Sequence, residues 1–187
     1  MGVPHFDSGP MRAEEFFAFT ATRPDDEKWE LIEGEPVLNA SASFLHQIIA
    51  SNLIVSLGQF ARETDASWAA VPGIGVRISP ICVPVPDVLV RPQTATGVEC
   101  DDMLIAFEIL SPSTANHDLR WKRKAYASLP SLVQYVVIAQ DALEVVSFDR
   151  ANDFAERRFE TAASVLDLPV ICASINLREI YRGTGLL

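Results

Sequence analysis

The sequence predicts a mixed α/β (α+β) fold in one domain, residues 1–187. The chain has 187 residues, of which 49% are hydrophobic and 21% charged, so it can bury a core of useful size. A long stretch with helical spacing follows a short strand pair, and further apolar runs alternate with helical segments. Two such runs flank the turn residues around Gly97, which is a hairpin signal.

The first half of the chain predicts a helix at about 11–19, because acids in its first turn precede three phenylalanines. The core is expected over about 29–149, beginning with strands at Trp29–Ile32 and Pro36–Leu38 joined at Gly34. A long helix is expected over Ala42–Arg62, since its apolar residues recur every three or four positions. They are Leu45, Ile48, Ile49, Leu53, Leu57 and Phe60.

The next segments predict strands at Ser67–Val71 and Gly75–Ile78, which lead through a proline-rich connection into the apolar run Val83–Pro92. We expect these three to be consecutive neighbours in one sheet. A second apolar run, Met103–Leu110, is followed by a helix from Asn116 or His117 to Ser128.

A hairpin is expected from Leu132–Ala139 and Leu143–Phe148, with a further strand at Phe154–Thr161. The segment at about 150–187 is expected to close the core with a short strand and a helical turn. The apolar hairpin could supply the surface of a homodimer, although sheet core is the favoured interpretation.

Composition narrows the classes of function. The net charge of −10, from 15 basic and 25 acidic residues, disfavours a protein that coats nucleic acid by bulk electrostatics, although a local basic patch is compatible with it. The three cysteines have no metal-ligand spacing, so we expect reduced packing residues. With no signal-peptide pattern and no apolar run of membrane-spanning length, we expect a cytoplasmic protein without a membrane partner.

Two carboxylates stand in the predicted hairpin. If its tip lies near Gly97 and Val98, equal steps back along the strands bring Asp87 opposite Glu108 on one face. Like charges placed opposite each other are destabilising, and a divalent cation or a lysine would compensate. Taken singly, Asp87 after a proline is ordinary turn chemistry and Glu108 could face solvent, but the pair favours a site.

A lysine follows the pair on a helix. Asp118, Lys122 and Tyr126 recur every four residues and therefore share one helical stripe. The ordinary interpretation is an exposed Asp118–Lys122 pair, worth about 0.3 to 0.5 kcal/mol. Lys124 is a second cation, turned about 200° away from Lys122 at 3.6 residues per turn.

Several segments, in this order, resemble one family. RAEEFF, WELIEGEPV, LHQIIASNL, VPDVLV, FEILSPST and DLRWKRKAY are similar to the motifs of the Uma-two restriction endonuclease family, within the PD-(D/E)XK nuclease superfamily. The resemblance covers roughly Met11 to Asp149. It implies a restriction endonuclease-like fold, a mixed central sheet flanked by helices, with acids on a central hairpin holding Mg²⁺ beside a scissile phosphate.

The family motif implies that Asp87 and Glu108 are catalytic metal ligands, together with the backbone carbonyl of Ile109. The superfamily lysine would stand at Leu110, and here Lys122 on the following helix matches its place. Arg120 and Trp121 depart from the family pattern and Lys124 lies close by, so either lysine could reach the phosphate, with spacing favouring Lys122.

Two more residues match the family motifs with roles less defined. Glu30 matches the first-strand glutamate, and its strand pattern lets it share a face with Ile32 or point outward. His46 matches the histidine at the start of the long helix. On spacing alone it is a core or boundary histidine, and a site residue if the helix start faces the acids.

The implied activity is Mg²⁺-dependent hydrolysis of nucleic-acid phosphodiester bonds, most simply of DNA, with Mn²⁺ as a substitute metal. The competing interpretation is a catalytically inactive nuclease-fold module for binding or structure, which the acidic net charge favours. A third is a phosphoesterase that uses the same site on another substrate.

Overall fold

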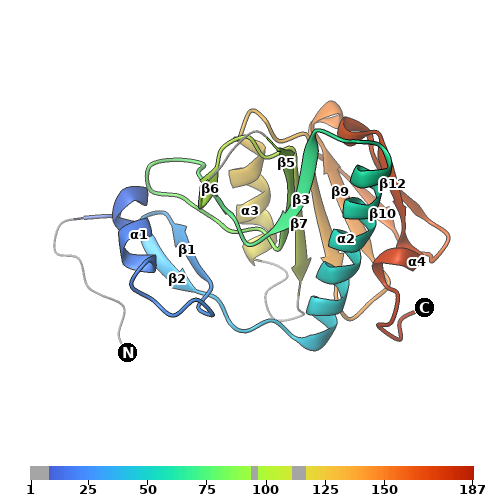
Figure 1. Cartoon of the computed structure of the whole chain (residues 1–187), viewed down its shortest axis with the longest axis horizontal. Coiled ribbons are helices and arrows are strands. Elements are labelled where there is room, and N and C mark those ends of the chain that lie inside the picture. The colour runs from blue at the N-terminus through green and yellow to red at the C-terminus, as the bar shows by residue number, and fades with distance from the viewer. Residues whose placement is uncertain (1–8, 94–96, 111–116) are drawn as a thin grey trace.

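A six-stranded mixed sheet lies at the centre of the computed structural model, which describes residues 9–93, 97–110 and 117–187, and of residues 117–119 only the backbone (Figure 1). The strand order is β10-β9-β8-β7-β5-β3. The strands are β3 (Trp68–Pro72), β5 (Val88–Pro92), β7 (Ile105–Leu110), β8 (Gln134–Ala139), β9 (Val145–Asp149) and β10 (Ala155–Phe159).

One parallel pair makes this sheet mixed. β7 and β8 run parallel and every other neighbouring pair is antiparallel. Because parallel neighbours need a crossover, the chain between β7 and β8 passes through helix α3 (His117–Ala127). β7 and β8 are buried on both faces, which explains why they are continuous apolar runs rather than alternating ones.

Helices cover both faces of the sheet. The long helix α2 (Phe44–Glu63) packs on one face, alongside β11 (Val165–Leu168), β12 (Ala173–Asn176) and helix α4 (Leu177–Ile180). Helix α3 packs on the other face, where Tyr126 meets Tyr135 of β8. Two 3₁₀ turns, Arg150–Asn152 and Pro169–Ile171, complete the C-terminal part. The expected mixed sheet flanked by helices is therefore confirmed.

The N-terminal part forms a satellite at one end of the sheet (Figure 1). Helix α1 (Ala13–Thr20) and strand β1 (Trp29–Ile32) pack around a small core that also includes Val83, and β1 pairs with the mostly exposed strand β2 (Glu35–Leu38). Leu31 joins it to the main body, exchanging two backbone hydrogen bonds with Val83 at 3.1 and 2.8 Å. This attachment carries β1 to the rim of the sheet, just ahead of β5.

The order of the strands corrects one prediction. Gly75–Ile78 does not lie between its chain neighbours in the main sheet, because β3 pairs directly with β5. The segment instead contributes the short strand β4 (Gly75–Val76), which pairs in parallel with β6 (Glu99–Cys100). Prolines 80, 84 and 86 follow, and since proline lacks the N–H that a ladder needs, β5 begins at Val88 rather than Val83.

Helix α2 bears on the expectation that no apolar run in the chain reaches the length of a membrane span. Its 20 residues, with a mean hydropathy of 1.3, are long and apolar enough by length and composition alone. Polar residues interrupt it, so it is not a continuous apolar run. Its face bearing Ile49, Leu53 and Leu57 is buried in the core, as in any core helix.

Candidate active site

The two acids of the predicted hairpin lie level with each other. In the antiparallel pair β5–β7, Val88 stands opposite Phe107 and Val90 opposite Ile105. One step further along the same register sets Asp87, immediately before β5, level with Glu108 on β7. Equal steps from a tip at Gly97 and Val98 give the same register, which is thereby confirmed.

Asp87 is held by three donors. The Nε2 atom of His46 lies 3.0 Å from its Oδ2 atom, and the backbone N–H of Ile109 donates to the same oxygen at 2.8 Å. The ammonium of Lys28 donates to Oδ1 at 3.0 Å. Burial opposes the charge of Asp87, but the hydrogen bond from His46 and the charge of Lys28 outweigh it and hold the pKa of Asp87 well below its usual range. Asp87 is therefore a carboxylate at neutral pH.

His46 reaches Asp87 because of where α2 begins. Ser43 is the N-cap, and its side chain accepts a hydrogen bond from the backbone N–H of His46 at 3.2 Å. With His46 in contact with Asp87, the first turn of α2 faces the acids. This is the arrangement in which the sequence predicts His46 to be a site residue.

Glu108 belongs to a second, more deeply buried network. The ammonium of Lys122 donates to both oxygens of Glu108, at 3.1 and 3.2 Å, and lies 3.1 Å from Oε1 of Glu30. The hydroxyl of Tyr126 donates to Glu108 Oε1 at 2.9 Å. Lys122 and Tyr126 stand one turn apart on α3, so the stripe expected from the sequence is the one that faces the sheet.

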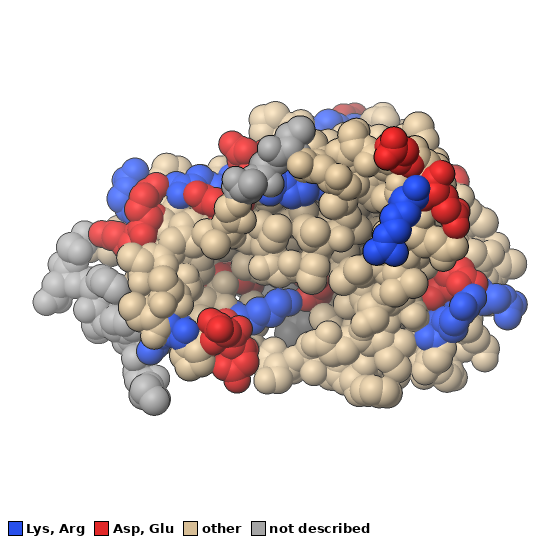
Figure 2. Space-filling model, viewed as in Figure 1, with Lys and Arg blue, Asp and Glu red and all other residues tan. Residues whose placement is uncertain are grey.

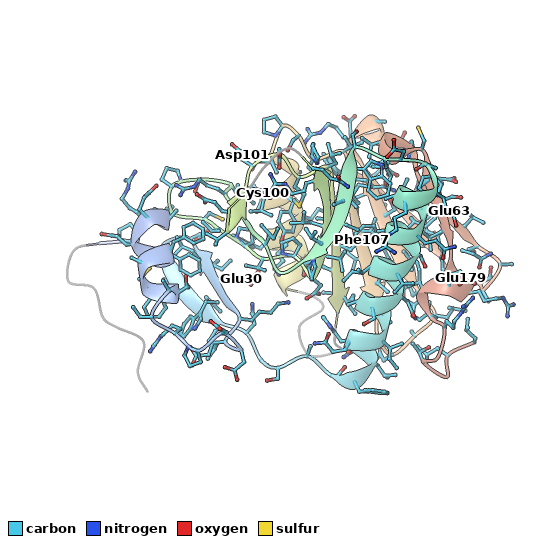
Figure 3. All side chains as sticks on the ribbon, viewed as in Figure 1. Glu30, Glu63, Cys100, Asp101, Phe107 and Glu179 are labelled. Atoms are coloured by element: carbon cyan, nitrogen blue, oxygen red, sulfur yellow. The ribbon has the colours of Figure 1, made fainter. Side chains whose placement is uncertain are left out.

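Glu30, which is labelled in Figure 3, is buried and lies on β1 of the N-terminal hairpin. Its Oε1 accepts the backbone N–H of Val85 at 2.7 Å, and its Oε2 accepts the side-chain amide of Asn39 at 3.0 Å. Of the two orientations that the strand pattern allowed, the buried one is observed.

The charges in this network oppose one another. Burial is the largest influence on Glu108 and raises its pKa; Lys122 lowers it, while Asp87 and Glu30 raise it, with a net rise to about 8. For Lys122, burial works against the ammonium, but Glu108 and Glu30 raise its pKa above the usual value. The lysine is thus charged, and Glu108 sits in an environment that favours its protonated form until a cation is added.

Asp87, Glu108 and Lys122 line one cavity of 320 Å³. The face shown in Figure 2 has a hollow between the N-terminal part and the body of the sheet, and both positive and negative side chains lie at it. The other lining residues come from the segments just before β1 and β5, from the loop before α2 and its first turn, from the end of β7 and from the residue after β8. They are Lys28, Asn39, Ala40, Ser41, Ala42, Ser43, His46, Val85, Ile109, Leu110 and Gln140.

Two predicted residues stand apart from this arrangement. Lys124 is exposed and lines a different pocket with Trp121, so Lys122 is the helix lysine that the structure brings to the acids. The side chain of Asp118 lies outside the part of the chain that the structure describes. Ile109 lines the cavity, while the ligand role of its carbonyl stays a prediction.

Sequence reasoning missed Lys28, Asn39 and Gln140. Gln140 follows β8 directly and accepts a hydrogen bond from Ser43 at 2.6 Å, which ties the start of α2 to the sheet. Lys28 is 59 residues from Asp87 in sequence, and it stands just before a strand with no pattern that marks it as a site residue. A search for a second cation near the WELIEGE motif could have found it.

Comparison with known proteins identifies the family. A model of the Uma2 family, described as "Putative restriction endonuclease", matches residues 13–177. The chain belongs to the Uma2 family. This match extends past Asp149, where the resemblance in the sequence ended, and includes the C-terminal closing segment as far as Leu177. A comparison with curated proteins found no match.

A solved structure shares the fold of this Uma2 member. It is the crystal structure of a protein from Anabaena variabilis ATCC 29413, described as a "putative nuclease belonging to DUF820". The two are 14% identical, and the similarity covers 92% of this chain and 98% of that one with a TM-score of 0.74. At this identity the likeness establishes the fold alone.

Proposed function

We propose that this Uma2 protein is an Mg²⁺-dependent endonuclease that hydrolyses phosphodiester bonds of DNA. The observation that supports the proposal most directly is the arrangement of Asp87 and Glu108. They lie level on neighbouring strands, in a cavity that also receives a buried lysine. Family membership supports the same class of reaction.

The donor set fits Mg²⁺. Within residues 9–93, 97–110 and 117–187, no group of three or more His, Cys, Asp or Glu side chains is placed to hold a metal. Mg²⁺ uses one or two carboxylates and completes its shell with waters and phosphate oxygens, so Asp87 and Glu108 suffice. Burial and the neighbouring acids raise the pKa of Glu108, and a bound cation would favour its carboxylate form. Mn²⁺ would satisfy the same oxygens.

The roles of the chain's own groups follow from their contacts. Bound Mg²⁺ would lower the pKa of the attacking water and would place positive charge beside the phosphoryl oxygens. His46 and the Ile109 N–H fix Asp87 Oδ2, while Lys122 and Tyr126 fix Glu108, so both carboxylates are oriented before substrate arrives. In the reaction, a water oxygen bonds to phosphorus, the P–O bond to the leaving nucleotide breaks, and the leaving oxygen takes up a proton.

The experiment that tests this is cleavage of supercoiled plasmid. We expect nicking or linearisation with Mg²⁺ or Mn²⁺, none with EDTA, and loss of cleavage in Asp87→Ala. Asp26→Ala removes an exposed acid outside the cavity and serves as the matched control. Circular dichroism establishes that both variants fold. Unchanged cleavage by Asp87→Ala would disprove the assignment.

A second candidate function is a nuclease-fold module without turnover. One observation favours it: the Lys122 ammonium is fully engaged by Glu30 and Glu108, as in a purely structural ion network. Calorimetry separates the two. Mg²⁺ binding that disappears in Glu108→Gln supports the nuclease, and no heat of binding at millimolar Mg²⁺ supports the module. RNA and phosphomonoesters tested beside the plasmid define the substrate.

A further inference from the structure

The two lysines of the cavity are engaged differently. An ammonium group has three N–H donors, and those of Lys122 are matched by three carboxylate contacts, with 14% of the side chain exposed. The Lys28 ammonium has one carboxylate contact, to Asp87 Oδ1 at 3.0 Å, and 42% of its side chain is exposed. In the described structure, Lys28 is therefore the lysine of the cavity with donors left for a ligand.

We propose that Lys28 is a phosphate-binding subsite for the backbone of the nucleic-acid strand. The inference rests on the proposed nuclease function and names a substrate contact that the family motifs do not include. Lys122 then acts as a positioning residue that orients Glu30 and Glu108, whereas Lys28 contacts the substrate.

Lys28 lies at the border between two cavities of different charge. Lys28 and Val85 line the cavity that holds the acids, and both also line a neighbouring cavity of 490 Å³ beside α1. Asp25 and Glu27 line that second cavity, so a phosphate is disfavoured there. A backbone phosphate beside the acids is therefore best placed at Lys28, on the border of the acidic second cavity rather than inside it.

The electrostatics of the cavity require such a contact. The Asp87 carboxylate in the cavity wall repels a phosphodiester, and the whole chain carries a net charge of −10. In the described residues, the basic side chains that line the cavity are Lys28, His46 and Lys122. His46 and Lys122 each have 14% of their side chains exposed and are bound to carboxylates. An approaching phosphate therefore meets Lys28 first.

The ion pair with Asp87 holds the Lys28 ammonium in the cavity before a phosphate binds. The Lys28–Asp87 ion pair is partly exposed, and such pairs are weak in water, about 0 to 1 kcal/mol. A cation that occupies Asp87 Oδ1 displaces the ammonium, which can then turn to a phosphate oxygen without leaving the cavity. Removing Lys28 should accordingly not weaken Mg²⁺ binding, because a competing positive charge is lost.

The test compares Lys28→Gln with Lys28→Arg and with Lys124→Gln, an exposed lysine outside both cavities. Binding of a fluorescein-labelled DNA duplex is measured by anisotropy at several salt concentrations, with Ca²⁺ in place of Mg²⁺. Lys28→Gln should bind about tenfold more weakly and lower the slope of log K against log[salt] by about 0.9, the value for one phosphate contact. Lys28→Arg should keep the wild-type slope, and so should Lys124→Gln.

Mg²⁺ calorimetry on Lys28→Gln separates a substrate contact from an indirect effect through Asp87. Wild-type or tighter Mg²⁺ binding, together with the reduced slope, supports the subsite. Loss of Mg²⁺ binding would overturn it, because Lys28 would then act by holding Asp87 in place. Equal slopes in Lys28→Gln and Lys124→Gln would overturn it as well.

The outcome for Lys28 is distinguishable from the outcome for nuclease activity. A wild-type protein that cuts no substrate, but whose duplex binding depends on Lys28, refutes the proposed function and retains the subsite. Plasmid cleavage with the same KM in wild type and Lys28→Gln retains the proposed function and refutes the subsite.

Discussion

Replacing Glu108 by glutamine measures what the buried carboxylate costs the fold. Burial, with the neighbouring charges of Asp87 and Glu30, raises the pKa of Glu108 from 4.5 to about 8 despite the opposing charge of Lys122. The amide has nearly the same shape and can still accept the hydrogen bond from the Tyr126 hydroxyl. It carries no charge to neutralise on folding.

The sign of the effect follows from proton binding. Between pH 4.5 and about 8 the folded protein holds a proton on Glu108 that the unfolded chain has lost, so stability falls as pH rises through this window. Each pKa unit corresponds to about 1.4 kcal/mol, so the roughly 2.5 units between 4.5 and pH 7 put the loss of stability at pH 7 at about 3 kcal/mol. Glu108→Gln should lack this loss and gain on the wild type as pH rises, while losing metal-dependent cleavage.

Urea unfolding in EDTA at several pH values between 5 and 8 measures the difference. Asp26→Asn, which changes an exposed acid outside the cavity, should follow the wild type at every pH. If the stability of Glu108→Gln changes with pH in parallel with that of the wild type, the carboxylate is not held in its protonated form and the reasoning is refuted.

Three further substitutions or reactions test other parts of the structure. Tyr126→Phe removes a buried hydroxyl bonded to Glu108 and should lower the free energy of unfolding by about 1–3 kcal/mol; an unchanged urea midpoint would contradict that bond. Gly34→Ala should cost more than Gly73→Ala, because both have positive φ but an added Cβ at Gly34 meets Pro10 at 2.3 Å; equal losses would contradict the close approach. Cys172 is exposed and should react fastest with a thiol reagent at neutral pH, while burial raises the pKa of the other two thiols to about 11; three equally fast thiols would contradict their burial.

The parts of the site that the sequence predicts are those set by local regularity. The level arrangement of Asp87 and Glu108 follows from counting residues outward from one turn, because strands advance in step. The convergence of Lys122 and Tyr126 follows from helical periodicity once the face of α3 that meets the sheet is known. The register needs no information from distant parts of the chain, and the helical stripe needs only the face of α3 that packs on the sheet.

Long-range packing decided what the sequence did not show. Lys28 reaches Asp87 because the N-terminal hairpin docks at the rim of the sheet through Leu31 and Val83. No periodic pattern in the sequence predicts that docking. The prediction that Gly75–Ile78 lies between its chain neighbours in the main sheet was wrong for a similar reason. β3 finds its partner in β5 across a proline-rich detour, which a preference for consecutive pairing does not anticipate.

A lysine carried on the crossover helix, rather than on the strand beside the acids, makes the site depend on the docking of that helix against the sheet. β5 and β7 can pair through contacts close in sequence, but Lys122 arrives when α3 docks against β8. A chain with its hairpin formed and its helix undocked would carry both acids without the buried ammonium that orients Glu108. Complete assembly of the site is thereby reserved for the fully folded molecule, and hydrogen exchange in α3 should report on it more directly than exchange in the sheet.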